Sequence, residues 1–227
     1  MKIAVLTLEG CNEIDSFVAF AMLCRHKAPG WQVRITGPGR SVTSMNGVPV
    51  GIQQPLSWLA EADAVLVGSG VKTAQYAADA DFLAQLHLDP ARQLIGAQCS
   101  GSLLLQAKGL LGALPVCSDS MTRPHLEARG VTVLDRPFHA GERIATAGGC
   151  LASSYLATWM LARLADAGTA ARILHYVAPV GEKDAMVAHV FAATGLTAAQ
   201  PITPLPAPDV GTGTSARLFS GHGSGRS

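Results

Sequence analysis

The segment Leu94-Ile-Gly-Ala-Gln-Cys99-Ser-Gly-Ser-Leu-Leu-Leu-Gln-Ala-Lys-Gly-Leu-Leu111 places a cysteine between two apolar runs, in the order of a buried strand, a sharp turn and a helix. Gly96 and Gly101 flank Cys99, where a tight reversal of the chain leaves little room for side chains. This layout is that of a nucleophile elbow, which holds its nucleophile in a strained, exposed backbone conformation. The segment therefore predicts an α/β protein in which Cys99 follows a sheet strand.

The predicted position of Cys99 bears on its reactivity. At a helix N-terminus, unpaired backbone N–H groups and the positive end of the helix dipole stabilise a thiolate, so the sequence predicts a lowered pKa and a reactive thiol. The alternative is one more buried thiol, because free cysteine is among the most buried residue types. The strand, cysteine, glycine and helix in succession favour the functional interpretation.

Strand-like and helix-like segments alternate along the chain, which indicates a mostly parallel sheet with crossover helices. The expected strands are Lys2–Leu8, Trp31–Thr36, Ala64–Val67, Leu94–Gln98, Val131–Leu134 and Arg143–Thr146, with a hairpin over Val42–Ile52. The expected helices are Ile14–Arg25, Asp81–His87, Ser102–Leu110, Cys150–Ala165 and Ala170–Tyr176. Residues 1–195 are expected to form one domain, and residues 196–227, rich in Gly and Pro, a mobile tail.

Composition narrows the classes of partner. Lys and Arg total 17 against 16 for Asp and Glu, so no basic excess indicates nucleic acid or an anionic membrane. No apolar stretch approaches the roughly 18 residues of a membrane span, and the first apolar run is too short for a secretory leader, so we expect a cytoplasmic protein. The 5 cysteines are irregularly spaced without a C-x-x-C pair, and the histidines form no metal-binding pattern; we expect no disulfide framework, metal or cofactor.

Two further segments follow predicted strands, and the carboxyl ends of parallel strands are where ligands bind in such folds. Asp15 enters the first helix; it is either a helix-start carboxylate favoured by the dipole, or an acid within hydrogen-bond reach of Cys99 that passes a proton to a substrate. Ser69 and Gly70 form either a flexible turn or part of the site. In the second case, the N–H groups of Gly70 and Ser100 pair as an oxyanion hole.

These motifs resemble the ThiJ/PfpI superfamily, a class I glutamine amidotransferase-like group. The resemblance covers about residues 2–178 and is carried by Ala97-Gln-Cys-Ser-Gly101, Gly10-Cys-Asn-Glu-Ile-Asp15, Gly68-Ser-Gly70 and Thr146-Ala-Gly-Gly149. It implies a flavodoxin-like three-layer sandwich with a mostly parallel sheet, an acid beside the elbow cysteine, and a homodimer.

The residue after the cysteine separates branches of this superfamily. Protease-like members carry histidine there, whereas this chain has Ser100. A small hydroxyl together with Asp15 is similar to the isonitrile hydratase branch, in which thiolate attack, proton donation and water convert an isonitrile to an N-substituted formamide. Cys99, Ser100 and Asp15 are the matching positions, with Gly101 completing the elbow.

The chain also departs from that branch. Cys117-Ser-Asp119-Ser stands where Thr-Thr-His-Trp is typical, and Glu9 stands where proline is typical. The resemblance places Cys117 and Asp119 in a strand that faces the site, as possible pocket residues. If both line the pocket, the substrate should be polar or cationic.

Two functions of different class therefore follow. The first is a cysteine-dependent enzyme, a lyase or hydrolase, acting on a small molecule such as an isonitrile. The second is a redox or ligand sensor in which Cys99 is oxidised reversibly to the sulfinate. The pairing of thiol and acid favours the enzyme.

Overall fold

The computed structural model describes residues 1–197, so the expected tail lies outside the described residues apart from its first two positions. A seven-stranded sheet has the order β5-β2-β1-β6-β7-β9-β8. Its strands are β1 (Lys2–Leu6), β2 (Gln32–Gly37), β5 (Gln54–Pro55), β6 (Ala64–Val67), β7 (Leu94–Gln98), β8 (Phe138–Ala140) and β9 (Ile144–Ala147). All neighbours pair in parallel except β8, which runs antiparallel to β9.

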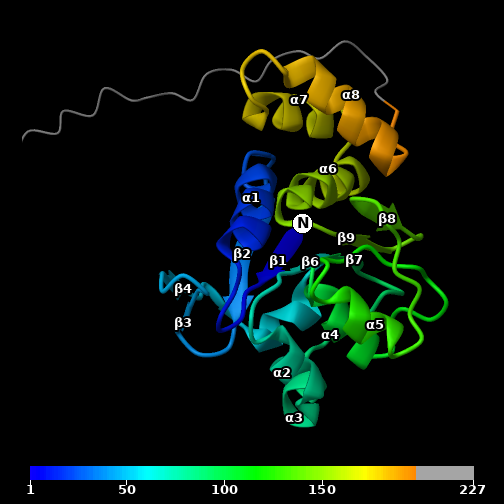
Figure 1. Ribbon diagram of the computed structural model, residues 1–227. Coiled ribbons are helices and arrows are strands. Elements are labelled where there is room, and N and C mark those ends of the chain that lie inside the picture. Colours follow the sequence, from blue (N-terminus) through cyan, green and yellow to red (C-terminus); the bar gives the residue numbers. More distant parts are fainter. Residues whose placement is uncertain (198–227) are drawn as a thin grey trace, which may run out of the picture.

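Helices cover both faces of the sheet, so the fold is the expected flavodoxin-like α/β sandwich (Figure 1). On one side lie α1 (Glu13–Leu23) and α6 (Ser153–Leu164), with α7 (Ala167–Val177) and α8 (Lys183–Thr194) stacked beyond α6. On the other lie α2 (Thr73–Ala78), α3 (Ala80–Gln85), α4 (Gly101–Ala107) and α5 (Arg123–Glu127). Two short 3-10 helices, η1 (Leu56–Glu61) and η2 (Cys150–Ala152), and a hairpin of β3 (Ser41–Thr43) with β4 (Pro49–Gly51) complete the described elements. No helix in residues 1–197 is both long and apolar enough to cross a membrane.

Two apolar clusters, one on each face, hold these layers together. Ile3, Val5 and Leu66 point to the α1 and α6 side, whereas Ala4, Leu6, Val65 and Val67 point to the α3 and α4 side. Side chains alternate along a strand, so a strand with both faces covered is apolar throughout. This is why β1, β6 and β7 are recognisable in the sequence as continuous hydrophobic runs.

Several sequence expectations need correction. Val131–Leu134 is not a strand: it contributes only an isolated bridge between Val133 and Val116, and the sheet edge is formed instead by β8. The helix expected from Cys150 begins as the 3-10 turn η2 and becomes α-helical at Ser153. Helices α2, α5 and α8 were not expected; the first two are short, and α8 lacks a marked apolar stripe.

The strand order places three loops together. Leaving out the edge strands, the order β2-β1-β6-β7-β9 is that of a doubly wound sheet whose direction of winding reverses beside β1. The loops after β1, β6 and β7 meet at the carboxyl edge near this reversal, and they lead to Asp15, Ser69 and Cys99 respectively.

Candidate active site

The turn after β7 has the geometry of an elbow. Cys99 has φ 47°, the left-handed region, and is the only non-glycine residue with positive φ in the described part of the chain. Its N–H donates to the carbonyl of Ala147 on the neighbouring strand at 2.8 Å. A Cβ at Gly101 would lie 2.7 Å from the carbonyl oxygen of Val67, so α4 packs on β6 more closely than any side chain permits. Cys99 is therefore held rigidly at the start of α4.

Asp15 lies in the first turn of α1 and is fully buried. Ser69 donates its hydroxyl hydrogen to Oδ2, while Oδ1 has no hydrogen-bond partner among the described residues. A carboxylate oxygen of Asp15, the sulfur of Cys99 and the sulfur of Cys150 all lie within 4.8 Å of one another. The predicted neighbours Asp15 and Cys99 are thus together, with a third group beside them.

That third group, Cys150, was not predicted as a site residue. It begins η2, directly after Gly149, and Asn12 donates its side-chain N–H to the Cys150 sulfur at 3.2 Å. The oxygen of the same Asn12 amide caps α1 by accepting from the N–H of Ile14. The only sequence signal was the position of Cys150 after the Gly148-Gly149 turn that follows a strand.

Gln98 was also missed. Its amide Nε2 lies 3.4 Å from the Cys99 sulfur and donates to the carbonyl of Gly149 at 2.8 Å. The residue is completely buried, and its Oε1 has no partner within the described chain. As the last residue of β7, Gln98 ties the elbow to the loop that carries Cys150.

The expected oxyanion pair is only partly free. The N–H of Gly70 donates to the side-chain oxygen of Ser100 at 3.2 Å, and that hydroxyl lies 3.0 Å from Thr73 Oγ1. The Ser100 hydroxyl therefore connects α4 to the loop after β6. Within the described residues, the backbone N–H of Ser100 has no hydrogen-bond acceptor, so it is the donor that remains available.

A cavity of about 480 Å³ opens beside these groups. Its polar lining comprises Asn12, Asp15, Ser69, Ser100, Asp119, Thr122 and His125, and both Cys99 and Cys150 reach it. At the mouth stand three large apolar side chains, Met45, Val71 and Met121, which are 46%, 64% and 80% exposed. Exposed apolar side chains gathered around one cavity favour binding of a ligand with an apolar part.

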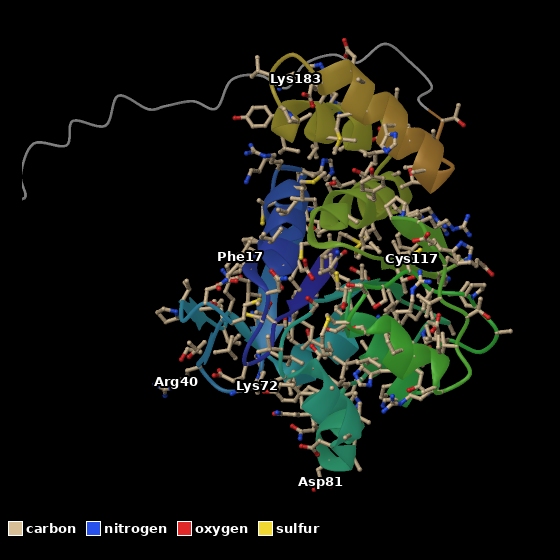
Figure 2. All side chains as sticks on the ribbon, viewed as in Figure 1. Phe17, Arg40, Lys72, Asp81, Cys117 and Lys183 are labelled. Atoms are coloured by element: carbon tan, nitrogen blue, oxygen red, sulfur yellow. The ribbon has the colours of Figure 1, made fainter. Side chains whose placement is uncertain are left out.

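Of the two possible pocket residues, one lies in the cavity and the other does not. Asp119 lines it, with Oδ1 already accepting from the N–H groups of Met121 and Thr122 at 3.0 and 2.8 Å. Cys117, labelled in Figure 2, is fully buried beside β9 and does not line the cavity. Its backbone N–H donates to Thr146 Oγ1. The condition for a distinctly acidic pocket is therefore not met.

The electrostatics of Cys99 differ from the sequence expectation. Burial raises the pKa of its thiol, and the negative charges of Asp15 and Asp119 raise it further, against a smaller lowering by the backbone at Gly149. Burial and then Asp15 also raise the pKa of Cys150. The predicted lowering of the Cys99 pKa is wrong, because desolvation and the neighbouring carboxylates raise it.

Together, the doubly wound sheet, the left-handed cysteine at the elbow and the buried acid beside it define an α/β protein with a thiol-based site. The model of the DJ-1/PfpI family matches residues 1–163, and the chain belongs to that family. No curated protein sequence matches it significantly.

Solved structures share the fold. Schizosaccharomyces pombe DJ-1 superposes with a TM-score of 0.68 at 16% identity, over 79% of this chain and 100% of its own. A ThiJ/PfpI family protein from Pseudomonas syringae superposes with a TM-score of 0.68 at 23% identity, over 86% of this chain and 87% of its own. A cysteine-to-alanine mutant of the DJ-1 superfamily protein STM1931 from Salmonella typhimurium superposes with a TM-score of 0.65 at 23% identity, over 78% of this chain and 97% of its own.

Proposed function

We propose that the protein is a cysteine-dependent enzyme that adds water to the carbon of a small isonitrile, giving an N-substituted formamide. The observation that carries this proposal is the Cys99 thiol at the elbow with the buried Asp15 carboxyl within 4.8 Å. A nucleophile and a proton-transfer group beside one cavity are what the reaction needs.

The raised pKa of Cys99 fits a resting state in which its sulfur carries a proton. As the sulfur attacks the isonitrile carbon, its proton passes to Asp15, and Asp15 then delivers that proton to the same carbon, giving a thioimidate. Water adds to the thioimidate carbon, the nitrogen takes a proton, and the C–S bond breaks to regenerate the thiol. One isonitrile and one water give one formamide, with no redox change.

Ser69 and Ser100 support this sequence of steps. Ser69 hydrogen-bonds Oδ2 of Asp15, which leaves Oδ1 without a partner among the described residues and available to exchange the proton. The free N–H of Ser100 is a donor for the negative charge that develops when water adds. Ser100 is thus a backbone donor, and its hydroxyl a positioning group for the Gly70 loop.

The cavity mouth bears on the substrate. Met45, Val71 and Met121 would contact the substituent on the isonitrile nitrogen, while the reacting carbon points to Cys99. We therefore expect isonitriles with apolar substituents to be turned over faster than charged ones.

The test is a panel of isonitriles, amides and α-oxoaldehydes, with product formation followed by NMR. Formamide should accumulate with wild type and with Cys117→Ser, a matched control outside the cavity. Cys99→Ser should abolish it, and Asp15→Asn should lower kcat by about 10²–10⁴-fold. Turnover of α-oxoaldehydes alone, or equal turnover by Cys99→Ser, contradicts the proposal.

A second candidate is a redox sensor without turnover, which the position of Cys150 beside Cys99 favours. A structural relative at 20% identity is described as Toxoplasma gondii DJ-1, oxidized, with a TM-score of 0.65. No product from any member of the panel, together with reversible oxidation of Cys99, is the result expected of a sensor.

We further propose that the protein is a homodimer. Large apolar side chains outside the cavity mouth are exposed, among them Leu151 at 73% and Val180 at 93%. Light scattering on the purified chain should give twice the mass of one chain; the mass of a single chain at micromolar concentration contradicts a stable dimer.

A further inference from the structure

We propose that Cys150 is a resolving thiol, which attacks an oxidised Cys99 and closes a disulfide between the two residues. The site would then be a two-cysteine centre that reacts with hydroperoxides. This inference concerns the cysteine used by the proposed function, but it does not require that function.

Proximity is the first support. The two sulfurs lie within 4.8 Å, whereas a disulfide needs about 2.05 Å, so the approach required is at most about 2.8 Å. Of the five free cysteines, only Cys99 and Cys150 line the cavity. Among the described residues, no other thiol is placed to reach Cys99 through the cavity.

The backbone allows this approach. Gly149, immediately before Cys150, has φ 88°, and a Cβ there would meet nothing within 4 Å. Glycine moves between backbone conformations at little cost, and Cys150 is the first residue of η2, the 3-10 turn that precedes α6. Cys150 can therefore swing toward the elbow, whose own position is fixed by the Ala147 and Gly101 contacts.

The polar partners suit a thiol that must react. Asn12 donates to the Cys150 sulfur and so offsets part of the rise that burial and Asp15 cause in its pKa, and the Gln98 amide lies 3.4 Å from the Cys99 sulfur. The buried Oδ1 of Asp15 has no partner in the described chain, and the Asp15 carboxyl is near both sulfurs. It is placed to accept the proton that either thiol loses.

The chemistry proceeds in two balanced steps. The Cys99 sulfur attacks the distal oxygen of a hydroperoxide, and Asp15 takes the thiol proton and passes it to the departing oxygen as the O–O bond breaks. An alcohol or water leaves, and Cys99 becomes a sulfenic acid. The Cys150 sulfur then attacks the Cys99 sulfur, the S–O bond breaks, and the hydroxide takes the Cys150 proton and leaves as water. The hydroperoxide is reduced by two electrons, and the two thiols are oxidised to one disulfide.

This pathway competes with sulfinate formation, which needs a second oxidant molecule. An intramolecular attack is faster than a second encounter at low oxidant concentration, so the disulfide should protect Cys99 from overoxidation. An external thiol reductant then restores both thiols.

The experiment uses the full reduced chain and about two equivalents of hydrogen peroxide, followed by intact mass under non-reducing conditions. Wild type should lose about 2 Da, and peptide mapping should join the Cys99 and Cys150 peptides; dithiothreitol should reverse both changes. Cys150→Ser should instead gain about 32 Da at Cys99, with at least about tenfold more sulfinate than wild type. Dimedone added with the peroxide should label Cys99 in this variant.

Cys117→Ser is the matched control, because its thiol is buried outside the cavity, and it should form the same disulfide as wild type. Equal sulfinate in wild type and Cys150→Ser overturns the proposal. Variants that keep only one cysteine of the pair give a second test. If dimedone labels Cys150 in one variant but does not label Cys99 in the other, Cys150 is the thiol that is oxidised first, and the proposal is overturned. These readouts are masses, so their failure leaves the hydration proposal standing, and a lack of turnover leaves the disulfide untouched.

Discussion

Removing the Asp15 charge should make Cys99 more reactive, not less. In the structure, a carboxylate oxygen lies within 4.8 Å of the Cys99 sulfur. At that distance and an effective dielectric constant of about 20, the repulsion between carboxylate and thiolate is on the order of 3 kcal/mol. Asp15→Asn removes this repulsion and should lower the Cys99 pKa, although burial still keeps it above that of a free thiol.

Relief of this repulsion raises the thiolate fraction on the order of 100-fold below the pKa, while the lower basicity reduces nucleophilicity, leaving a net gain of about tenfold in alkylation rate. The assay is iodoacetamide labelling of Cys99 between about pH 7 and 9, read by peptide mass spectrometry. Asp119→Asn is the control and should give a smaller gain, since Asp119 contributes less to the Cys99 pKa. An Asp15→Asn rate equal to or below that of wild type would refute the reasoning.

Three other expectations concern the fold, the thiols and the cap. Gly101→Ala should destabilise the protein by about 1–3 kcal/mol in denaturant unfolding, because its Cβ would lie 2.7 Å from a backbone oxygen, whereas Gly51→Ala, with open space, should have little effect. Burial raises the pKa of Cys117 from 9.0 to about 11, so between these pH values the folded state keeps the thiol proton that the unfolded state loses. The free energy of unfolding should therefore be unaffected by this thiol below pH 9 and should fall as the pH rises to 11. In Cys117→Ala, the fall of the unfolding free energy with pH should be smaller by about 1.4 kcal/mol per pH unit. Asn12→Ala should lower the free energy of unfolding by about 1 kcal/mol, because α1 loses its cap. The same variant should slow alkylation of Cys150, because its sulfur loses the hydrogen bond from Asn12 that favours the thiolate. Faster alkylation would contradict a role for that hydrogen bond.

The elements that sequence analysis predicted well are those whose physics is local. Strands β1, β6 and β7 are continuous apolar runs because both their faces are covered, and the Asn46-Gly47 turn specifies its hairpin. The elbow was predictable because glycine stands where a side chain would collide with β6. Short helices such as α2 and α5 carry too few residues for a periodic signal, and the edge strand β8 could be recognised only from its pairing.

The site was predicted in part for the same reason. Cys99 and Asp15 stand out because each follows a strand in a motif, but Cys150 and Gln98 join the site only through the packing of β7, β9 and the Gly149 loop. The sign of the Cys99 pKa shift was missed because desolvation and the nearby carboxylate are properties of the assembled site. The local helix dipole, visible from sequence, favours the opposite direction.

The left-handed backbone at Cys99 has a consequence for the evolution of the chain. A non-glycine residue in that region costs about 1 kcal/mol or more, so Cys99 holds a strained backbone that glycine would adopt without strain. Backbone strain alone would therefore favour glycine at this position. A sequence that keeps cysteine at position 99 retains a strained backbone together with a thiol, and a glycine at this position in a homologous chain would mark a member that has abandoned thiol chemistry.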